Sequence, residues 1–174
     1  MNTVELDRML NKFVRHYDMP SKYPGMDKPF KVNQFSVATD GKAMLLLKDH
    51  VLKRQNDKAV PDITDLLKQI DMIPAGDYRK IILLFSRATF VMEWCDSCDG
   101  SGCDDCDGEG YGMVDSESNI ITCDIGPHTV KLNVKYLNWL DGLRNTQCAV
   151  SEHGGNKLIV IKHEHGYCLI MGCN

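Results

Sequence analysis

The sequence lacks the features of several large functional classes. No apolar run approaches the roughly 20 residues that a membrane-spanning helix needs, and the first residues, MNTVELDRML, lack the basic-then-apolar order of a secretory signal. We therefore expect a cytoplasmic protein without membrane contact. The formal net charge is only −4, so any attraction to nucleic acid must come from a local group of basic residues.

Signatures of common enzymes are also missing. The sequence has no glycine-rich phosphate loop followed by Lys and Ser or Thr, no HExxH and no GxSxG. We expect a protein that is not an enzyme, while an enzyme whose site follows none of these patterns stays open as an alternative. His163 and His165 can place two imidazoles on one face of a strand and so bind a metal, but we favour the solvent side of an edge hairpin.

What is present suits one folded unit. The chain has 174 residues, of which 43% are apolar, and this is enough to bury a hydrophobic core. We interpret residues 1–174 as a single domain that carries a small insertion at residues 95–110.

Apolar periodicity predicts an α+β fold. Apolar residues at steps of three and four predict a first helix from Val4 to Tyr17 and a short one that begins near Pro61. The Asp40-Gly41 pair between two apolar stretches predicts a hairpin turn. The remaining predicted elements are strands at residues 81–85, 88–94, 120–125 and 128–133, a helix from Val134 to Leu143, and a terminal hairpin that turns at Gly166.

Eight cysteines are present, and four of them form a repeat. Residues 95–102 and 103–110 both follow the pattern CxxCxGxG, with nothing between the two copies. Two thiolates of a CxxC turn can face one ion, so the two turns supply four sulfurs. We predict a structural zinc site because a four-cysteine set leaves no open coordination position. The ligands are Cys95, Cys98, Cys103 and Cys106.

Other interpretations of these cysteines remain open. They include a pair of disulfides, an empty loop and an iron–sulfur cluster. Trp94 and Tyr111 flank the repeat, and we expect them to pair across the two strands that carry it. Cys123, Cys148, Cys168 and Cys173 lie in apolar or strand-like segments, where a buried, inert thiol is expected.

The repeat resembles the cysteine-rich domain of the DnaJ chaperone family, whose CxxCxGxG repeats bind zinc in pairs. That family has four repeats and a J domain with a His-Pro-Asp motif, and this sequence has neither. The resemblance therefore implies zinc binding and not chaperone activity.

The rest of the chain resembles a domain of the bacterial DNA polymerase sliding clamp. The matching segments are FSVATDGKAMLLL at 35–47, VKLNVKYLNWLDGL at 130–143 and KLIVIKHEHGYCLIM at 157–171. The resemblance implies antiparallel sheets with helices on one side. Six copies would be needed to form a ring, and such a homo-oligomer, a monomer and a dimer all remain open.

In the clamp family the helices face double-stranded DNA and contact its phosphates without reading sequence. The corresponding basic residues here are Arg8, Lys12, Arg15, Lys135 and Arg144. An ordinary solvated helix face is the alternative interpretation, since acidic residues lie among them.

Two functional hypotheses follow. In the first, the chain is a clamp-like accessory protein, encoded by a phage or mobile element, that acts on DNA or on a host replication or repair protein. In the second, it is an inhibitor or adaptor that binds another protein through the scaffold and the acidic zinc loop and does not touch DNA. Six acidic residues in 95–110 suit a basic partner surface.

Overall fold

The computed structural model describes residues 1–14, 25–52, 60–80, 92–94, 111–113, 120–139, 143 and 145–172. None of the helices in these ranges is long and apolar enough to cross a membrane. The helices are α1 (Thr3–Lys12), α2 (Thr64–Met72), α3 (Val134–Trp139) and a 3₁₀ turn, η1 (Ala75–Asp77). The strands are β1 (Phe30–Val32), β2 (Phe35–Thr39), β3 (Ala43–Lys48), β4 (Arg79–Lys80), β5 (Met92–Trp94), β6 (Tyr111–Met113), β7 (Ile120–Ile125), β8 (His128–Asn133), β9 (Gln147–His153), β10 (Asn156–His163) and β11 (Gly166–Met171).

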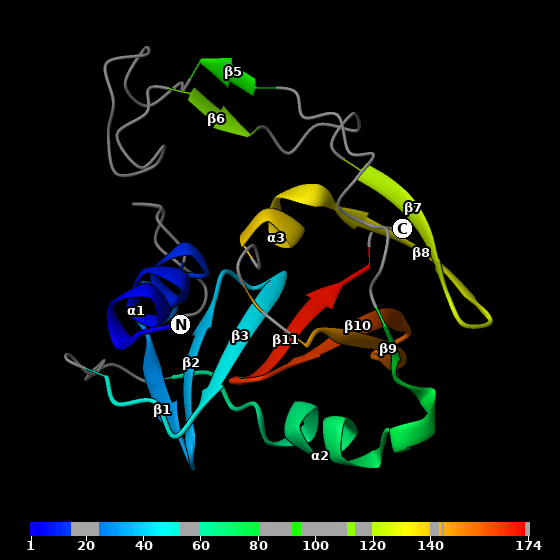
Figure 1. Ribbon diagram of the computed structural model, residues 1–174, viewed down its shortest axis with the longest axis horizontal. Coiled ribbons are helices and arrows are strands. Elements are labelled where there is room, and N and C mark those ends of the chain that lie inside the picture. Colours follow the sequence, from blue (N-terminus) through cyan, green and yellow to red (C-terminus); the bar gives the residue numbers. More distant parts are fainter. Residues whose placement is uncertain are drawn as a thin grey trace.

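Seven of the strands form one antiparallel sheet, in the order β1-β2-β3-β11-β10-β9-β4 (Figure 1). The predicted hairpin at Asp40-Gly41 joins β2 to β3, and Gly41 has the positive φ of 93° that such a turn requires. The predicted terminal hairpin is also present as β10 and β11. It lies in the interior of the sheet, because β11 pairs with β3 on its other side.

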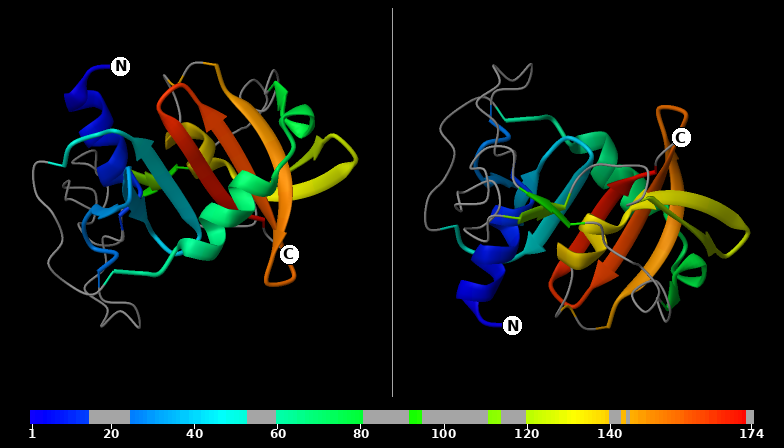
Figure 2. Two further views of the ribbon diagram at one scale, coloured as in Figure 1. Left: turned by 90° about the horizontal axis from the view of Figure 1, so that it is seen from below. Right: turned by 90° about the horizontal axis from the view of Figure 1, so that it is seen from above.

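The prediction that the helices lie on one side of the sheet is wrong. One face is covered by α1, α3 and the β7–β8 hairpin, whereas α2 crosses the opposite face (Figure 2). The reason is visible in β3, whose successive side chains Met44, Leu45 and Leu46 are all buried, in alternation on the two faces. A strand with only one face covered would alternate apolar with polar residues, so this sheet needs a helix on each side.

Several predicted elements differ in their bounds. The first helix ends at Lys12, with Phe13 as its C-cap, and α3 is described only to Trp139. The segment before the Asp40 turn is two strands, because Asn33 adopts a φ of 52° and turns the chain between β1 and β2. Strand β9 was not predicted, and the predicted strand at residues 81–85 lies outside the described residues.

Gly166 lies where two strands of the sheet approach too closely for a side chain. Its φ is 144°, and a Cβ built there would lie 2.1 Å from the carbonyl oxygen of Leu46. Only glycine therefore permits β11 to approach β3 at this position. The adjacent backbone bond from the Lys48 amide to the His165 carbonyl, 2.8 Å long, closes the junction.

Strands β5 and β6 pair with each other and with no other described strand. They lie beyond α1 and α3, on the same side of the large sheet as these helices (Figure 1). Trp94 lies directly opposite Tyr111, as predicted. The two strands thus place opposite each other the two residues that flank the cysteine repeat, while residues 95–110 lie outside the described residues.

Candidate nucleic-acid interface

Helix α1 presents an apolar side to the sheet and a basic side to solvent. Asn2 and Glu5 form a capping box, in which each side chain accepts a hydrogen bond from the other residue's backbone amide, at 3.0 and 2.8 Å. The side chains that pack into the core are Leu6, Met9 and Leu10. Arg8 and Lys12 are exposed, one helical turn apart. Within the described ranges neither has an ion-pair partner.

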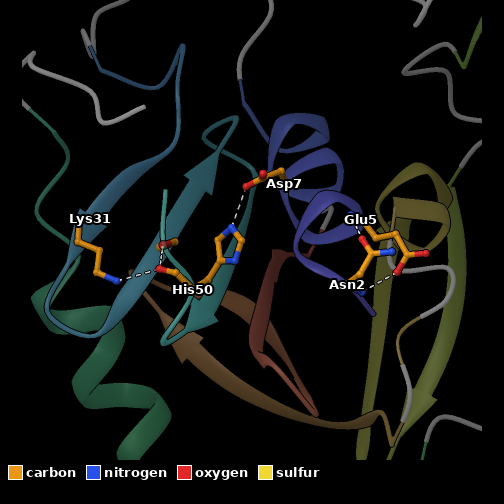
Figure 3. A network of polar contacts seen from close by, with 6 residues as sticks. Asn2, Glu5, Asp7, Lys31 and His50 are labelled. Carbon is orange, nitrogen blue, oxygen red and sulfur yellow. Dashed lines mark hydrogen bonds and ion pairs between the residues drawn. The ribbon is translucent and has the colours of Figure 1, made fainter. Parts of the chain in front are cut away.

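Both acidic residues of α1 make hydrogen bonds within the protein, Glu5 at the exposed start of the helix and Asp7 with a buried histidine. Glu5 takes part in the capping box, and the Oδ1 atom of Asp7 lies 2.9 Å from Nε2 of His50 (Figure 3). The His50 side chain is 4% exposed and that of Asp7 is 20% exposed. The sequence predictions counted both acids as charges that dilute the basic side of the helix, whereas the structure turns Asp7 toward the sheet.

The segment that carries His50 is itself fixed to the sheet. The carbonyl oxygen of His50 accepts hydrogen bonds from Oγ of Ser36, at 2.7 Å, and from Nζ of Lys31, at 3.0 Å (Figure 3). Ser36 is completely buried, and a buried hydroxyl needs such a partner. These hydrogen bonds fix the backbone of His50, and its imidazole faces α1.

Helix α3 is anchored on the turn between β2 and β3. Oδ1 of Asn133 accepts a hydrogen bond from the amide of Lys135 at the start of the helix, at 2.9 Å. Tyr136 is 2% exposed, and its hydroxyl donates to Oδ2 of Asp40 at 2.9 Å. The other oxygen of Asp40 accepts from the amides of Lys42 and Ala43. Asp40 thus holds both the turn and the helix.

Aromatic rings join the two helices. Phe13, at the end of α1, packs edge to face against Trp139 of α3, with ring centroids 4.9 Å apart. Trp139 also packs against Tyr136 at 5.1 Å. Nζ of Lys135 lies 5.1 Å from the Tyr136 ring and 5.9 Å from the Trp139 ring, within cation–π range. The basic residues of α1 and α3 therefore belong to neighbouring helices of one surface.

This surface contains three of the five basic residues that the sequence predicted. Arg8 and Lys12 are exposed on α1, and Lys135 is half-buried at the contact between the helices. Arg15 and Arg144 lie outside the described residues. The sequence predictions missed the contact between Asp7 and His50, the Asp40–Tyr136 bond and the role of Trp139. Only Trp139 had a local signal, because it follows Tyr136 by three residues on the helix.

His163 of the terminal hairpin does not have the solvent-exposed position that the sequence predicted. His163 does not lie on the solvent side of an edge hairpin, because its hairpin is central in the sheet and its side chain is buried, with 5% exposed. Its Nδ1 accepts a hydrogen bond from the His165 amide at 3.2 Å, and its Nε2 has no partner in the part of the chain that the structure describes. Burial lowers the pKa of His163 to about 4, against a smaller opposing effect of the Tyr167 backbone.

The described residues contain no group of three or more His, Cys, Asp or Glu side chains that could hold a metal. The predicted ligands Cys95, Cys98, Cys103 and Cys106 lie outside these residues. Cys148 and Cys168 are buried free thiols, as predicted. Burial raises the pKa of both thiols, and a buried neutral thiol is a poor nucleophile.

Comparison with known proteins finds no matching family model, curated protein or solved structure.

Proposed function

We propose that the chain is a non-enzymatic accessory protein that binds double-stranded DNA through the surface formed by α1 and α3. The observation that carries this proposal is the balance of charge on that surface. Arg8 and Lys12 are exposed, whereas the carboxylates of Glu5, Asp7 and Asp40 all accept hydrogen bonds within the protein. Glu5 stays exposed at the start of α1, so the exposed charges of this helix are two positive and one negative, and the balance is positive.

A ligand of this kind would be bound through its phosphates. Exposed Arg and Lys side chains on a helix contact phosphate oxygens, and these contacts carry no sequence information. We therefore propose binding that does not depend on sequence and that weakens steeply as salt is added.

The resemblance to sliding clamps supports the proposal because clamp helices also face DNA. Helices α1 and α3 share one face of the sheet here, in keeping with that resemblance, whereas α2 on the other face departs from it. We further propose that the clamp-like domain carries one structural zinc ion, bound by Cys95, Cys98, Cys103 and Cys106. The pairing of Trp94 with Tyr111 supports this proposal, because it holds the two ends of the repeat together.

Fluorescence anisotropy with two labelled duplexes of unrelated sequence tests DNA binding. The unsubstituted chain should bind both alike, and a variant with Arg8, Lys12 and Lys135 replaced by Ala should bind both more weakly. The slope of log K against log salt should become shallower by about 3, since each lost phosphate contact removes about 0.9 from it. Lys68→Ala, which removes an exposed cation from α2 on the opposite face, is the matched control and should bind normally.

Two outcomes would contradict the proposal. One is equal binding by the triple variant and the unsubstituted chain. The other is no binding by the unsubstituted chain at low salt, which would favour the adaptor that binds a protein partner instead.

A further inference from the structure

The contact between Asp7 and His50 has a consequence for the charge of the α1 surface. Asp7 immediately precedes Arg8, so its carboxylate is the acidic group nearest in sequence to the first exposed cation. A carboxylate free to turn to solvent would repel the phosphates that Arg8 is expected to attract. Its position should therefore affect the affinity for phosphates.

The structure supplies a specific partner that keeps this carboxylate away from the exposed side. Nε2 of His50 lies 2.9 Å from Oδ1 of Asp7, and the side chain of His50 is 4% exposed. Hydrogen bonds from Ser36 and Lys31 to the His50 carbonyl fix the backbone from which the imidazole projects. The imidazole therefore stays in place and keeps the Asp7 carboxylate near the protein interior (Figure 3).

We propose that His50 is a positioning residue for DNA binding, which acts by holding the Asp7 carboxylate against the sheet and away from the phosphates. The inference rests on the proposed DNA-binding function. It concerns charge and not only the attachment of α1, because the helix is also held by Leu6, Met9, Leu10 and Phe13 in the core. Loss of the imidazole should therefore weaken the hold on the carboxylate while leaving the helix in place.

A set of four variants separates these two roles. His50→Ala should weaken binding of a labelled duplex about threefold at low salt, and the loss should disappear at high salt because screening removes the repulsion. Adding Asp7→Asn to His50→Ala should restore the affinity, although the double variant still lacks the contact. Asp7→Asn alone should bind at least as well as the unsubstituted chain. His50→Gln, whose amide can also donate to Asp7, should bind nearly normally.

The restored affinity of the double variant is the decisive measurement. A purely structural role of His50 predicts that the double variant binds as weakly as His50→Ala or more weakly, and this result would overturn the inference. Thermal unfolding of each variant shows whether it folds. If His50→Ala does not fold, the comparison of Asp7→Asn with the unsubstituted chain tests the inference instead. Weaker binding by Asp7→Asn would then refute the role of charge. Absence of DNA binding by the unsubstituted chain would overturn both proposals, whereas binding that is lost in the Arg8, Lys12 and Lys135 variant but unchanged in His50→Ala would overturn only this one.

Discussion

Acidification should destabilise this protein through His163, a buried imidazole in the middle of the large sheet. In the unfolded chain this histidine takes up a proton with its ordinary pKa of 6.5, whereas in the folded protein burial lowers the pKa to about 4. Between these two values the unfolded state binds a proton that the folded state does not. The free energy of unfolding therefore falls as the pH falls from 6.5 to about 4, and this contribution is complete below the folded pKa.

The size of the effect follows from the two pKa values. A difference of one between the folded and unfolded pKa is worth 1.36 kcal/mol, so values of 6.5 and about 4 predict a loss of about 3 kcal/mol. Typical domains have a free energy of unfolding of about 5–15 kcal/mol, so the loss is a large fraction of the total.

Urea unfolding at a series of pH values from 4 to 7.5 measures this loss. Carboxylates also titrate in this range, so the comparison is made with His163→Asn, whose Oδ1 can still accept the hydrogen bond from the His165 amide. The stability difference between the unsubstituted chain and this variant should shrink by about 3 kcal/mol from pH 7 to pH 4.

Ile161→Ala is the matched control, since Ile161 is buried on the same face of β10 and does not titrate. It should lower stability by the same amount at every pH. The explanation would be refuted if His163→Asn and the unsubstituted chain showed parallel pH curves, because the imidazole would then titrate alike in the folded and unfolded states.

Three further predictions concern other parts of the fold. Gly166→Ala should lower the free energy of unfolding by roughly 3 kcal/mol, since its Cβ would meet the Leu46 carbonyl. Gly154→Ala, where φ is 57° and the surrounding space is open, should lower it by only about 1 kcal/mol. Equal losses in the two variants would argue against the close approach of β11 to β3 at Gly166. Tyr136→Phe should cost about 1.5 kcal/mol by removing the hydroxyl that donates to Asp40, and no change in a thermal melt would mean that this bond does not anchor α3. Chelation should release about one zinc per chain, expose four thiols and leave the far-UV circular dichroism nearly unchanged, and global unfolding would instead show that the metal holds the whole domain together.

The parts of the fold that the sequence predicted correctly depend on neighbouring residues. The Asp40-Gly41 turn is one of these, because its backbone conformation is set by the two residues themselves. The pairing of Trp94 with Tyr111 is another, since a repeat that begins and ends between two strands brings their ends together. The burial of Cys148 and Cys168 followed from the apolar residues beside them.

The parts that the sequence did not predict depend on contacts between distant segments. Periodicity shows that α2 has an apolar side, but it does not show which face of the sheet that side covers. The burial of His163 requires β11 to pair with β3, and strand order cannot be read from the strands themselves. Asp7 and His50 are 43 residues apart, so nothing in either local sequence indicates their contact.

The prediction of the interface was limited in the same way. Arg8 and Lys12 could be identified as basic residues on one side of a helix. Whether their charge is available depends on what the neighbouring acids contact, and these contacts are tertiary. The charge pattern of a helix therefore predicts an interface only in combination with the partners of its acidic residues.

The position of β11 between β3 and β10 has a consequence for synthesis on the ribosome. Leu47 pairs with Gly166, so β3 has no partner on one side until the chain has been made almost to residue 171. During that time β3 exposes a strand edge that can pair with another nascent chain, and β2 and β3 expose apolar faces that can associate with one. Yield in a cell should therefore depend on translation rate, temperature and access to holdase chaperones more strongly than the stability of the finished fold would suggest.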